Sequence, residues 1–338
     1  MAQMMAATVS ALLVLITNLV VHASPASAKV VIAYVSQGVR VAPIWIAQEQ
    51  GFFSKYGIQS ELVWIKAAPL SITALHTGDA QVAYTAGSSP LGAALDKDDL
   101  RIVAGLFNKA DLDLVARPEI KAPEDLRGKR VGVVSIGGGN WMQALLGLEH
   151  LGINSQRGDV QVVVSGVQSI LNQALETGVI DAAVVNTAFS HRLREKGFTI
   201  LLALSKANIA LQALGLVVKK SFILEQPDVL EAILKGVIEA LAFSVAPRNR
   251  ATVVGILQKI LRTSDSAALE EGYQDLLRTV ERKPYTSLEG MRNIQRLVKT
   301  YNPRVEKAKV EDLIDNRVLR RLDETGFIDR LYRTYGVK

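Results

Sequence analysis

The sequence predicts an α/β protein whose sheets are parallel or mixed and covered by helices, followed by a helical C-terminal region. Strand and helix patterns alternate from residue 30 to about residue 217. A βαβ unit opens this alternation, and from Pro227 onward the patterns are only helical. Regular alternation of this kind is typical of sheets that carry helices on both faces.

The expected strands are short apolar runs bounded by Gly, Pro, Asn or Asp. They fall at 30–35, 61–65, 82–85, 101–106, 112–116, 130–134, 160–164, 182–185, 199–203 and 214–218. Helices are expected in most of the gaps between these strands. The C-terminal helices are expected at 227–245, 248–261, 266–279, 287–301, 310–323 and 326–335.

The first helix of the alternation has clear start and stop signals. Pro43 stands where a helix begins, because its fixed φ and missing N–H suit the first turn. Gly51 is expected to end the helix. An aromatic turn, 52–58, then leads into the strand at 61–65. This run therefore predicts a strand, a loop, a helix and a second strand in that order.

The N-terminal segment predicts a cleaved signal peptide over residues 1–28. Residues 6–21 are almost all apolar, and Ala26-Ser27-Ala28 matches an A-x-A-type cleavage site. The apolar run is short for a membrane span. Residues 1–6 contain no Lys or Arg, which a signal peptide usually has, so an uncleaved anchor is the alternative. Cleavage predicts a mature protein in the periplasm.

Composition excludes several classes of site. The 338 residues suffice for two domains, with 49% hydrophobic and 21% charged residues. The absence of cysteine excludes disulfides, thiolate metal sites and a cysteine nucleophile. The net charge of +6 is spread over segments where basic and acidic residues alternate, which indicates solvated helix faces. We therefore expect no nucleic-acid partner.

The residues that could carry catalysis or bind a metal do not assemble. None of the four histidines, His22, His76, His150 and His191, has a partner at metal-ligand spacing. There is no G-x-S-x-G motif and no phosphate-binding loop signature. The sequence therefore predicts no catalytic residues, no metal and no cofactor.

Four segments follow one another along the chain. They are A-P-I-W-I-A-Q-E-Q-G-F-F-S-K-Y-G-I at 42–58, A-L-H-T-G-D-A-Q-V-A at 74–83, A-P-E-D-L-R-G-K-R-V-G-V at 122–133 and A-L-E-T-G-V-I-D-A-A at 174–183. Taken in this order, they resemble the periplasmic solute-binding proteins of ABC transporters. The closest group is the nitrate, sulfonate and taurine branch, which includes thiamine-pyrimidine-type proteins. Gln81 stands where that family usually has Asp.

The resemblance implies a type II periplasmic-binding-protein fold, with two α/β lobes joined by two crossing strands. Lobe one would comprise 29–115 and 216–338, and lobe two 116–215, with crossings near 114–118 and 212–217. Lobes joined in this way close on a ligand. The helical C-terminal extension is expected to pack on lobe one.

The resemblance also implies a function: a monomeric protein that captures a small solute and delivers it to an ABC permease and its ATPase. Sulfonates, taurine, nitrate, aromatic carboxylates and pyrimidines all occur as ligands in the family. Two alternatives remain open, a ligand sensor and an enzyme on the same fold, such as a pyrimidine synthase.

Ligands of open α/β sheets bind beyond the carboxyl ends of the strands, where loops lead into helices. The loops at these places are rich in Gly, Ser, Thr and Asn, which suits a small anion or a heterocycle. They contain no Asp or Glu, which argues against a cationic ligand. The expected ligand-binding residues are Ser36, Gln37, Gly38, Arg40, Gly87, Ser88, Ser89, Gly138, Gly139, Asn140, Trp141, Asn186 and Thr187.

Each of these residues has a structural alternative. The Ser and Asn residues are also good helix caps. Arg40 suits a forked contact with a carboxylate, sulfonate or phosphate, and is equally suited to a solvated surface. Trp141 is placed either to stack on a ligand or to fill the core. The loops 87–89 and 137–140 are expected to face each other across the cleft.

Overall fold

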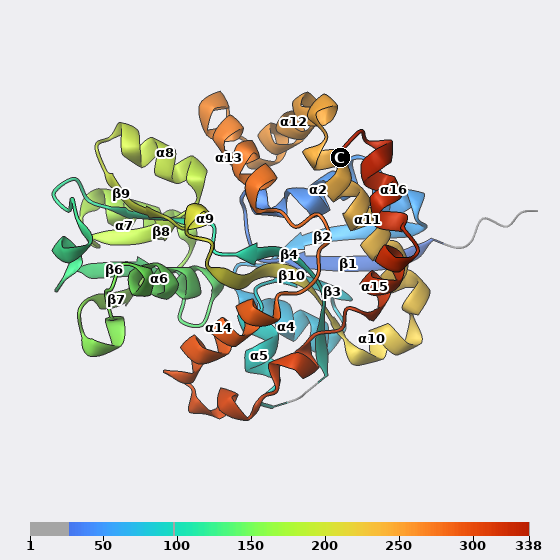
Figure 1. Cartoon of the computed structure of the whole chain (residues 1–338), viewed down its shortest axis with the longest axis horizontal. Helices are drawn as coiled ribbons and strands as arrows, with labels where there is room; N and C mark the ends of the chain where they lie inside the picture. Colours follow the sequence, from blue (N-terminus) through green and yellow to red (C-terminus); the bar gives the residue numbers. More distant parts are fainter. Residues whose placement is uncertain (1–26, 97–98, 338) are drawn as a thin grey trace, which may run out of the picture.

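The computed structural model describes residues 27–96 and 99–337, and two α/β lobes make up this part of the chain (Figure 1). Lobe one contains the first five-stranded sheet and lobe two the second. The fold class predicted from the sequence is therefore confirmed. Most of the predicted signal peptide, residues 1–26, lies outside the described residues.

The sheet of lobe one has the strand order β2-β1-β3-β10-β4. β1 is parallel to β2 and β3, whereas β10 is antiparallel to both β3 and β4. The strands are β1 (Ala28–Tyr34), β2 (Ile58–Trp64), β3 (Val82–Thr85), β4 (Leu100–Lys109) and β10 (Ala210–Lys219). β2 begins three residues before the predicted strand, at Ile58, which pairs with Ala28.

The sheet of lobe two has the equivalent order β7-β6-β8-β5-β9. β6 is parallel to β7 and β8, and β5 is antiparallel to β8 and β9. The strands are β5 (Asp113–Ala116), β6 (Arg130–Val133), β7 (Gln161–Val164), β8 (Ala182–Val185) and β9 (Thr199–Ala203). In both lobes, parallel strands whose carboxyl ends meet at one edge place the following loops together.

The chain crosses between the lobes earlier than the sequence suggested. Residues 113–115, assigned to lobe one, form part of β5 in the second sheet. Residues 210–215, assigned to lobe two, form part of β10 in the first sheet. The crossing segments are therefore 110–112 and 204–209, and the second includes the short helix α9 (Leu204–Ala207).

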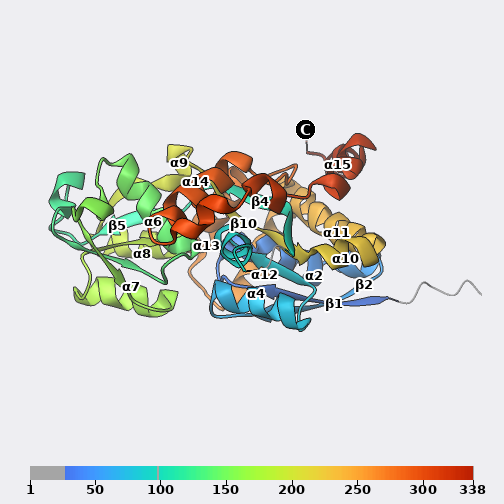
Figure 2. The same cartoon turned by 90° about the horizontal axis from the view of Figure 1, so that it is seen from below.

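The helices cover the sheets and also form the C-terminal region (Figures 1 and 2). The α-helices other than α9 are α2 (Ala42–Glu49), α3 (Phe52–Lys55), α4 (Ala68–Thr77), α5 (Ser88–Ala93), α6 (Gly139–His150), α7 (Gln168–Thr177), α8 (Thr187–Glu195), α10 (Lys220–Glu225), α11 (Pro227–Val245), α12 (Arg250–Leu261), α13 (Ser266–Thr279), α14 (Leu288–Lys299), α15 (Arg317–Glu324) and α16 (Phe327–Thr334). The 3₁₀ turns are η1 (Val39–Val41), η2 (Pro123–Leu126), η3 (Ser155–Arg157), η4 (Pro247–Asn249), η5 (Pro303–Lys307) and η6 (Val310–Leu313). The helix predicted at 310–323 is thus the turn η6 followed by α15.

The opening run folds as its residues predict. Pro43 lies in the first turn of α2, and Gly51 follows the helix with a φ of 69°, which favours glycine. Phe52 and Phe53 are buried. A β-carbon on Gly236 of α11 would lie 2.9 Å from Phe53 Cδ1, so the missing side chain lets α11 approach the aromatic turn. The run thereby anchors the longest C-terminal helix to lobe one.

The C-terminal region contacts both lobes, although it was expected to pack on lobe one. α11 packs on α2, α3 and α16 within lobe one. α13 packs on α8 of lobe two, and α14 packs on β10 and on α6 of lobe two. Figure 1 shows α13 above strands β4 and β10, and α14 below them. The two helices therefore flank the crossing segments.

Candidate functional site: the cleft between the lobes

The loops that follow the parallel strands of the two lobes meet face to face. A β-carbon on Gly139, after β6, would lie 3.4 Å from Cβ of Ala86, after β3. A β-carbon on Gly38, after β1, would lie 3.9 Å from Nδ2 of Asn186, after β8. Loops from opposite lobes are thus brought together, as the sequence predicted.

Two helices of lobe two begin at this meeting point. α6 starts at Gly139, and its N-cap residue, Gly138, has no side chain to bond the first N–H groups. α8 starts at Thr187, and the Asn186 side chain accepts a hydrogen bond from the N–H of Phe189 at 2.9 Å. Free N–H groups and the helix dipole make such an N-terminus attractive to an anion. The N-terminus of α6 has no side-chain cap, whereas that of α8 has one from Asn186.

Ser88 is the side chain in the cleft loops that lacks a partner. It begins α5, is 6% exposed, and its Oγ is buried without a hydrogen bond. An unsatisfied buried hydroxyl costs about 1–3 kcal/mol. Its neighbour Ser89 is satisfied, because its Oγ lies 3.1 Å from Oγ1 of Thr85. The hydroxyl of Ser88 is therefore available to a further polar group.

Arg40 is used within the protein. Its Nη1 lies 3.0 Å from Oδ1 of Asp111, in the first crossing segment. Gln143 of α6 donates to the same carboxylate oxygen at 3.1 Å and accepts from the N–H groups of Asp111 and Leu112. Tyr84 donates to the carbonyl of Arg40 at 2.7 Å. Arg40 thus links lobe one, the crossing and lobe two.

Asn140 and Trp141 also have internal partners. Asn140 accepts from the N–H of Val134 at 3.0 Å and donates to the carbonyl of Val184 at 2.9 Å, which ties the ends of β6 and β8. Trp141 is 5% exposed and packs edge to face on Tyr301, with ring centroids 5.1 Å apart. Both side chains shape the cleft from within lobe two.

The cleft glycines allow close packing between segments. A β-carbon on Gly87 would lie 2.6 Å from Sδ of Met291 on α14. A β-carbon on Gly137 would lie 2.5 Å from the hydroxyl of Tyr301, and Gly137 has a φ of 77°. These positions need glycine because α14 approaches the loops of both lobes. Ser36 is half-buried and Gln37 is exposed at the remaining loop.

Three aspartates near the crossings were missed by the sequence analysis. Asp111 and Asp113 are 6% and 7% exposed, and burial raises the pKa of both carboxyl groups. Asp275 of α13 accepts a hydrogen bond from Thr187, and burial raises its pKa to about 6. Acidic groups therefore lie beside the crossings and next to Thr187, outside the loops from which the ligand was predicted. The signal for Asp111 and Asp113 was D-L-D at 111–113, inside an apolar run, whereas no local pattern marked Asp275.

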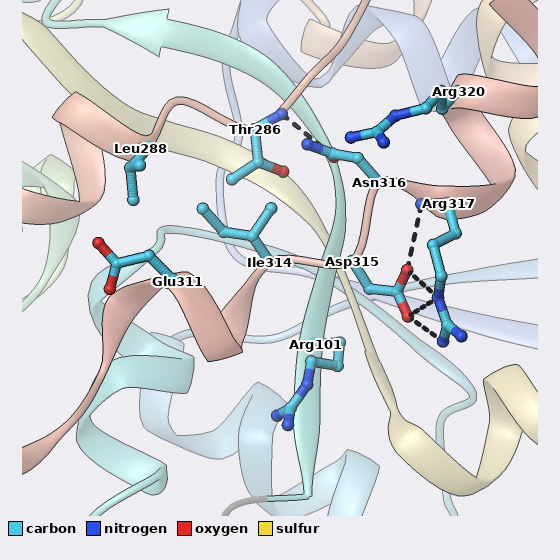
Figure 3. Close-up of a pocket in the computed structure, with 9 residues that line it drawn as sticks. All are labelled: Arg101, Thr286, Leu288, Glu311, Ile314, Asp315, Asn316, Arg317 and Arg320. Carbon is cyan, nitrogen blue, oxygen red and sulfur yellow. Dashed lines mark hydrogen bonds and ion pairs between the residues drawn. The ribbon is translucent and has the colours of Figure 1, made fainter.

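Two pockets lie elsewhere on lobe one. One, of about 410 Å³, lies where residues 310–320 cover the edge strand β4 (Figure 3). Within it Asp315 pairs with Arg317, and the N–H of Thr286 donates to Asn316, while Glu311 pairs with Arg292. The second, of about 490 Å³, is lined by Val280, Glu281, Arg282, Lys283, Asp329 and Tyr332. We assign the candidate site to the cleft, where loops of both lobes converge.

The described residues contain neither a group of three or more His, Asp or Glu side chains placed to hold a metal ion nor a helix long and apolar enough to cross a membrane. No curated protein matches the chain in sequence.

Several solved structures share the fold at low sequence identity. A protein of Bordetella bronchiseptica RB50 is 19% identical, with a TM-score of 0.75, covering 88% of this chain and 98% of its own. The periplasmic aliphatic sulphonate binding protein SsuA of Escherichia coli is 18% identical, with a TM-score of 0.67, covering 85% and 96%. The desulfurization enzyme DszB is 16% identical, with a TM-score of 0.65, covering 88% and 99%. Binding proteins and an enzyme therefore share this architecture.

The match to a family model is more direct. Residues 39–251 match the model described as NMT1/THI5 like. This range includes both crossing segments and all the cleft loops except residues 36–38. The chain therefore belongs to the NMT1/THI5-like family.

Proposed function

We propose that this protein is the extracytoplasmic substrate-binding component of an ABC importer. The observation that carries the proposal is the unpartnered hydroxyl of Ser88, buried in a loop that faces the uncapped start of α6. A ligand held between the lobes supplies the missing hydrogen bond. The likeness to the sulphonate binding protein supports the same role.

The ligand is a small anion or a molecule with one anionic group, such as a sulfonate, taurine or nitrate. Backbone N–H groups at the starts of α6 and α8 are the anion-binding elements. Arg40 is not the main cationic contact, because Asp111 neutralises it at 3.0 Å. Ser36, Gln37, Gly38 and Asn186 are the remaining residues that we propose for the site, and the approach of Gly38 to Asn186 supports their inclusion.

The last step of the proposed function is delivery of the bound ligand to the permease. The protein acts as a monomer in the periplasm after removal of residues 1–28, and passes its ligand to a permease powered by an ATPase. Mass spectrometry of the protein exported by its host tests the cleavage, with Lys29 as the expected N-terminus. A product that keeps residues 1–28 and stays with membranes would refute this part of the proposal.

Ligand binding is tested by calorimetry and native mass spectrometry with methanesulfonate, taurine, nitrate, benzoate and cytosine. We expect one anionic class to bind with 1:1 stoichiometry. Ser88→Ala removes the hydroxyl and should weaken binding about ten-fold, because a hydrogen bond to a charged group contributes about 1.5 kcal/mol or more. Ser54→Ala, at an exposed position of α3, is the matched control. Binding of no anion, or equal binding by both variants, would contradict the proposal.

An enzymatic role is the second candidate, favoured by the structural likeness to DszB. The absence of cysteine limits the nucleophiles that such a reaction could use. Recovery of the bound ligand after long incubation distinguishes the two functions. A binding protein returns it unchanged, whereas a product of altered mass would establish an enzyme.

A further inference from the structure

Helix α13 joins the two lobes through polar side chains. It follows lobe one in the chain, yet it packs on α8 of lobe two. Thr187, the first residue of α8, donates its hydroxyl hydrogen to Asp275 of α13. One turn earlier on α13, Glu271 lies 3.9 Å from Nε2 of His191 and 3.9 Å from Nη2 of Arg194. These polar contacts connect α13 with lobe two.

The same helix touches the first cleft loop. A β-carbon on Gly272 would lie 2.7 Å from Cγ2 of Val39, so the helix and the loop after β1 pack without a gap. Gly272 lies three residues before Asp275, on the same helix. α13 thus contacts the candidate site on lobe one and the start of α8 on lobe two.

Asp275 lies in an acidic surrounding. Its side chain is 15% exposed, and Arg278 on the same helix contacts its carboxylate. The carboxylates of Asp113 and Asp111, in and beside β5, both disfavour its ionised form. Burial is the largest cause that raises the pKa of Asp275 to about 6. In the closed form, the group is therefore easier to protonate than a carboxyl group in water.

We propose that Asp275 is a positioning residue for lobe closure, and that its protonation couples ligand capture to pH. This inference rests on the proposed function and names a regulation of the same site. Thr187 holds Asp275 in both protonation states, because a carboxyl group accepts a hydrogen bond whether or not it is ionised. Protonation removes the charge that Asp111 and Asp113 oppose.

The direction of the effect follows from linkage. Opening returns Asp275 to water and lowers its pKa toward about 4, the value of a solvated aspartate. The closed form therefore binds more protons than the open form between these two values. Closure is favoured as pH falls through that window and is least favoured above about pH 6. Capture of a ligand by closure has the same dependence.

Other charged groups surround this contact and set its baseline. They belong to every element that packs on α13 near the crossings. They are His191, Arg192 and Arg194 of α8, Arg40 of η1, Lys109 of β4, Lys206 of α9, Asp113 of β5, and Glu271 and Arg278 of α13 itself. Burial also raises the pKa of Asp111 and Asp113, so these carboxyl groups can take up protons in the same acidic range, and comparison with an Asp275 variant separates its contribution from theirs.

A closure assay without ligand tests the inference directly. The sequence contains no cysteine, so Gln59→Cys on β2 and Gln161→Cys on β7 are the two labelling sites, both exposed. Energy transfer between dyes at these sites reports the distance between the lobes. We expect the ratio of closed to open molecules to rise about four-fold from about pH 7.5 to about pH 5.5, from a closed-form pKa of about 6 and an open-form pKa of about 4.

Three variants separate charge from geometry. Asp275→Asn retains an acceptor for Thr187 but cannot ionise, so its closure at neutral pH should exceed that of the wild type at about pH 5.5 and match that of the wild type well below about pH 4, with most of the pH response lost. Thr187→Val removes the donor and should reduce closure at every pH. Asp265→Asn on the same helix retains an N-cap for Ala268 and should behave as the wild type.

The affinity of the tightest-binding anion in the panel provides a second readout. We expect it to rise with falling pH by the same factor as closure, with proton uptake measured by calorimetry in two buffers of different ionisation heat. A pH response that survives in Asp275→Asn would overturn the inference, as would equal closure at both pH values in the wild type. If no anion binds, the proposed function fails while the closure assay still decides the role of Asp275.

Discussion

The two contacts that the C-terminal helices make with lobe two differ in chemistry. Between α13 and α8 the contact is polar: Thr187 donates to Asp275, and Glu271 lies near His191 and Arg194. Between α14 and α6, Trp141 packs on Tyr301, and Arg296 forms two hydrogen bonds of 2.9 Å with Glu149. They lie on opposite sides of the crossing segments (Figure 1).

The difference indicates that closure has two independent components. Aromatic packing between α14 and α6 depends little on pH or salt, because it arises from burial of apolar surface. The contact between α13 and α8 depends on the ionisation of carboxyl groups whose burial is unfavourable. A hinge with these two contacts combines a constant preference for closure with a preference that solution conditions change.

The largest effect is expected from the aromatic contact. Trp141→Ala removes a ring that is 5% exposed and should reduce the free energy of unfolding by about 3 kcal/mol. Trp64→Ala, at a position 39% exposed, should cost about 1 kcal/mol or less. Urea unfolding measures both values. Equal losses in the two variants would show that the α14 contact adds no packing of its own.

A buried hydrogen-bond network around Asp111 lies between the two contacts and joins Arg40 of lobe one to Gln143 of lobe two. Asp111→Ala leaves Arg40 without its ion pair and Gln143 without an acceptor for its amide group. Because the partners remain buried, we expect a loss of about 3 kcal/mol in unfolding free energy. Asp111→Asn retains an acceptor and should lose less. The prediction is wrong if the alanine variant is as stable as the asparagine variant.

The elements of each lobe were predictable because their signals are local. Pro43 and Gly51 bound the first helix, and apolar runs of four to seven residues mark most strands. The convergence of loops 87–89 and 137–140 followed from a general rule about strand ends. These features depend on neighbouring residues or on the topology, so one sequence was sufficient for them.

The partners of individual side chains were not predictable, because they come from distant segments. Arg40 was assigned to a ligand, but Asp111, 71 residues later, neutralises it. Thr187 was assigned to a ligand, but it donates to Asp275, 88 residues later. The reach of α13 and α14 to lobe two also depends on tertiary packing. No periodicity in the C-terminal helices indicates which lobe their faces contact.

The polar contact should make stability depend on pH in a defined window. The pKa of Asp275 is raised to about 6 in the folded state, so folding takes up a proton between about pH 4 and that value. Its contribution is most favourable below about pH 4 and is lost as pH rises to about 6, a change of about 3 kcal/mol. The difference in unfolding free energy between wild type and Asp275→Asn, measured across this range, isolates the effect.

The carboxyl groups with lowered pKa have the opposite sign and a different window. Ion pairs lower the pKa of Asp181 and Glu231, so their stabilisation is lost only as pH falls below about 4. A wild-type curve alone combines both trends, which is why the comparison with Asp275→Asn is needed. A difference that is constant from about pH 4 to about pH 7 would contradict the assignment.

The smallest effect is expected at the ion pair of the aromatic contact. Arg296 and Glu149 are aligned in a two-bond geometry, but their side chains are 52% and 38% exposed. Water and salt screen such a pair, so Arg296→Gln should cost about 0.5 kcal/mol, and less at 1 M salt. Arg292→Gln, which breaks an exposed pair with Glu311 inside lobe one, is the matched control. If Arg296→Gln reduces closure in the dye assay while Arg292→Gln does not, the pair helps to hold lobe two in place. If both variants close as the wild type does, Trp141 and Tyr301 alone account for the α14 contact.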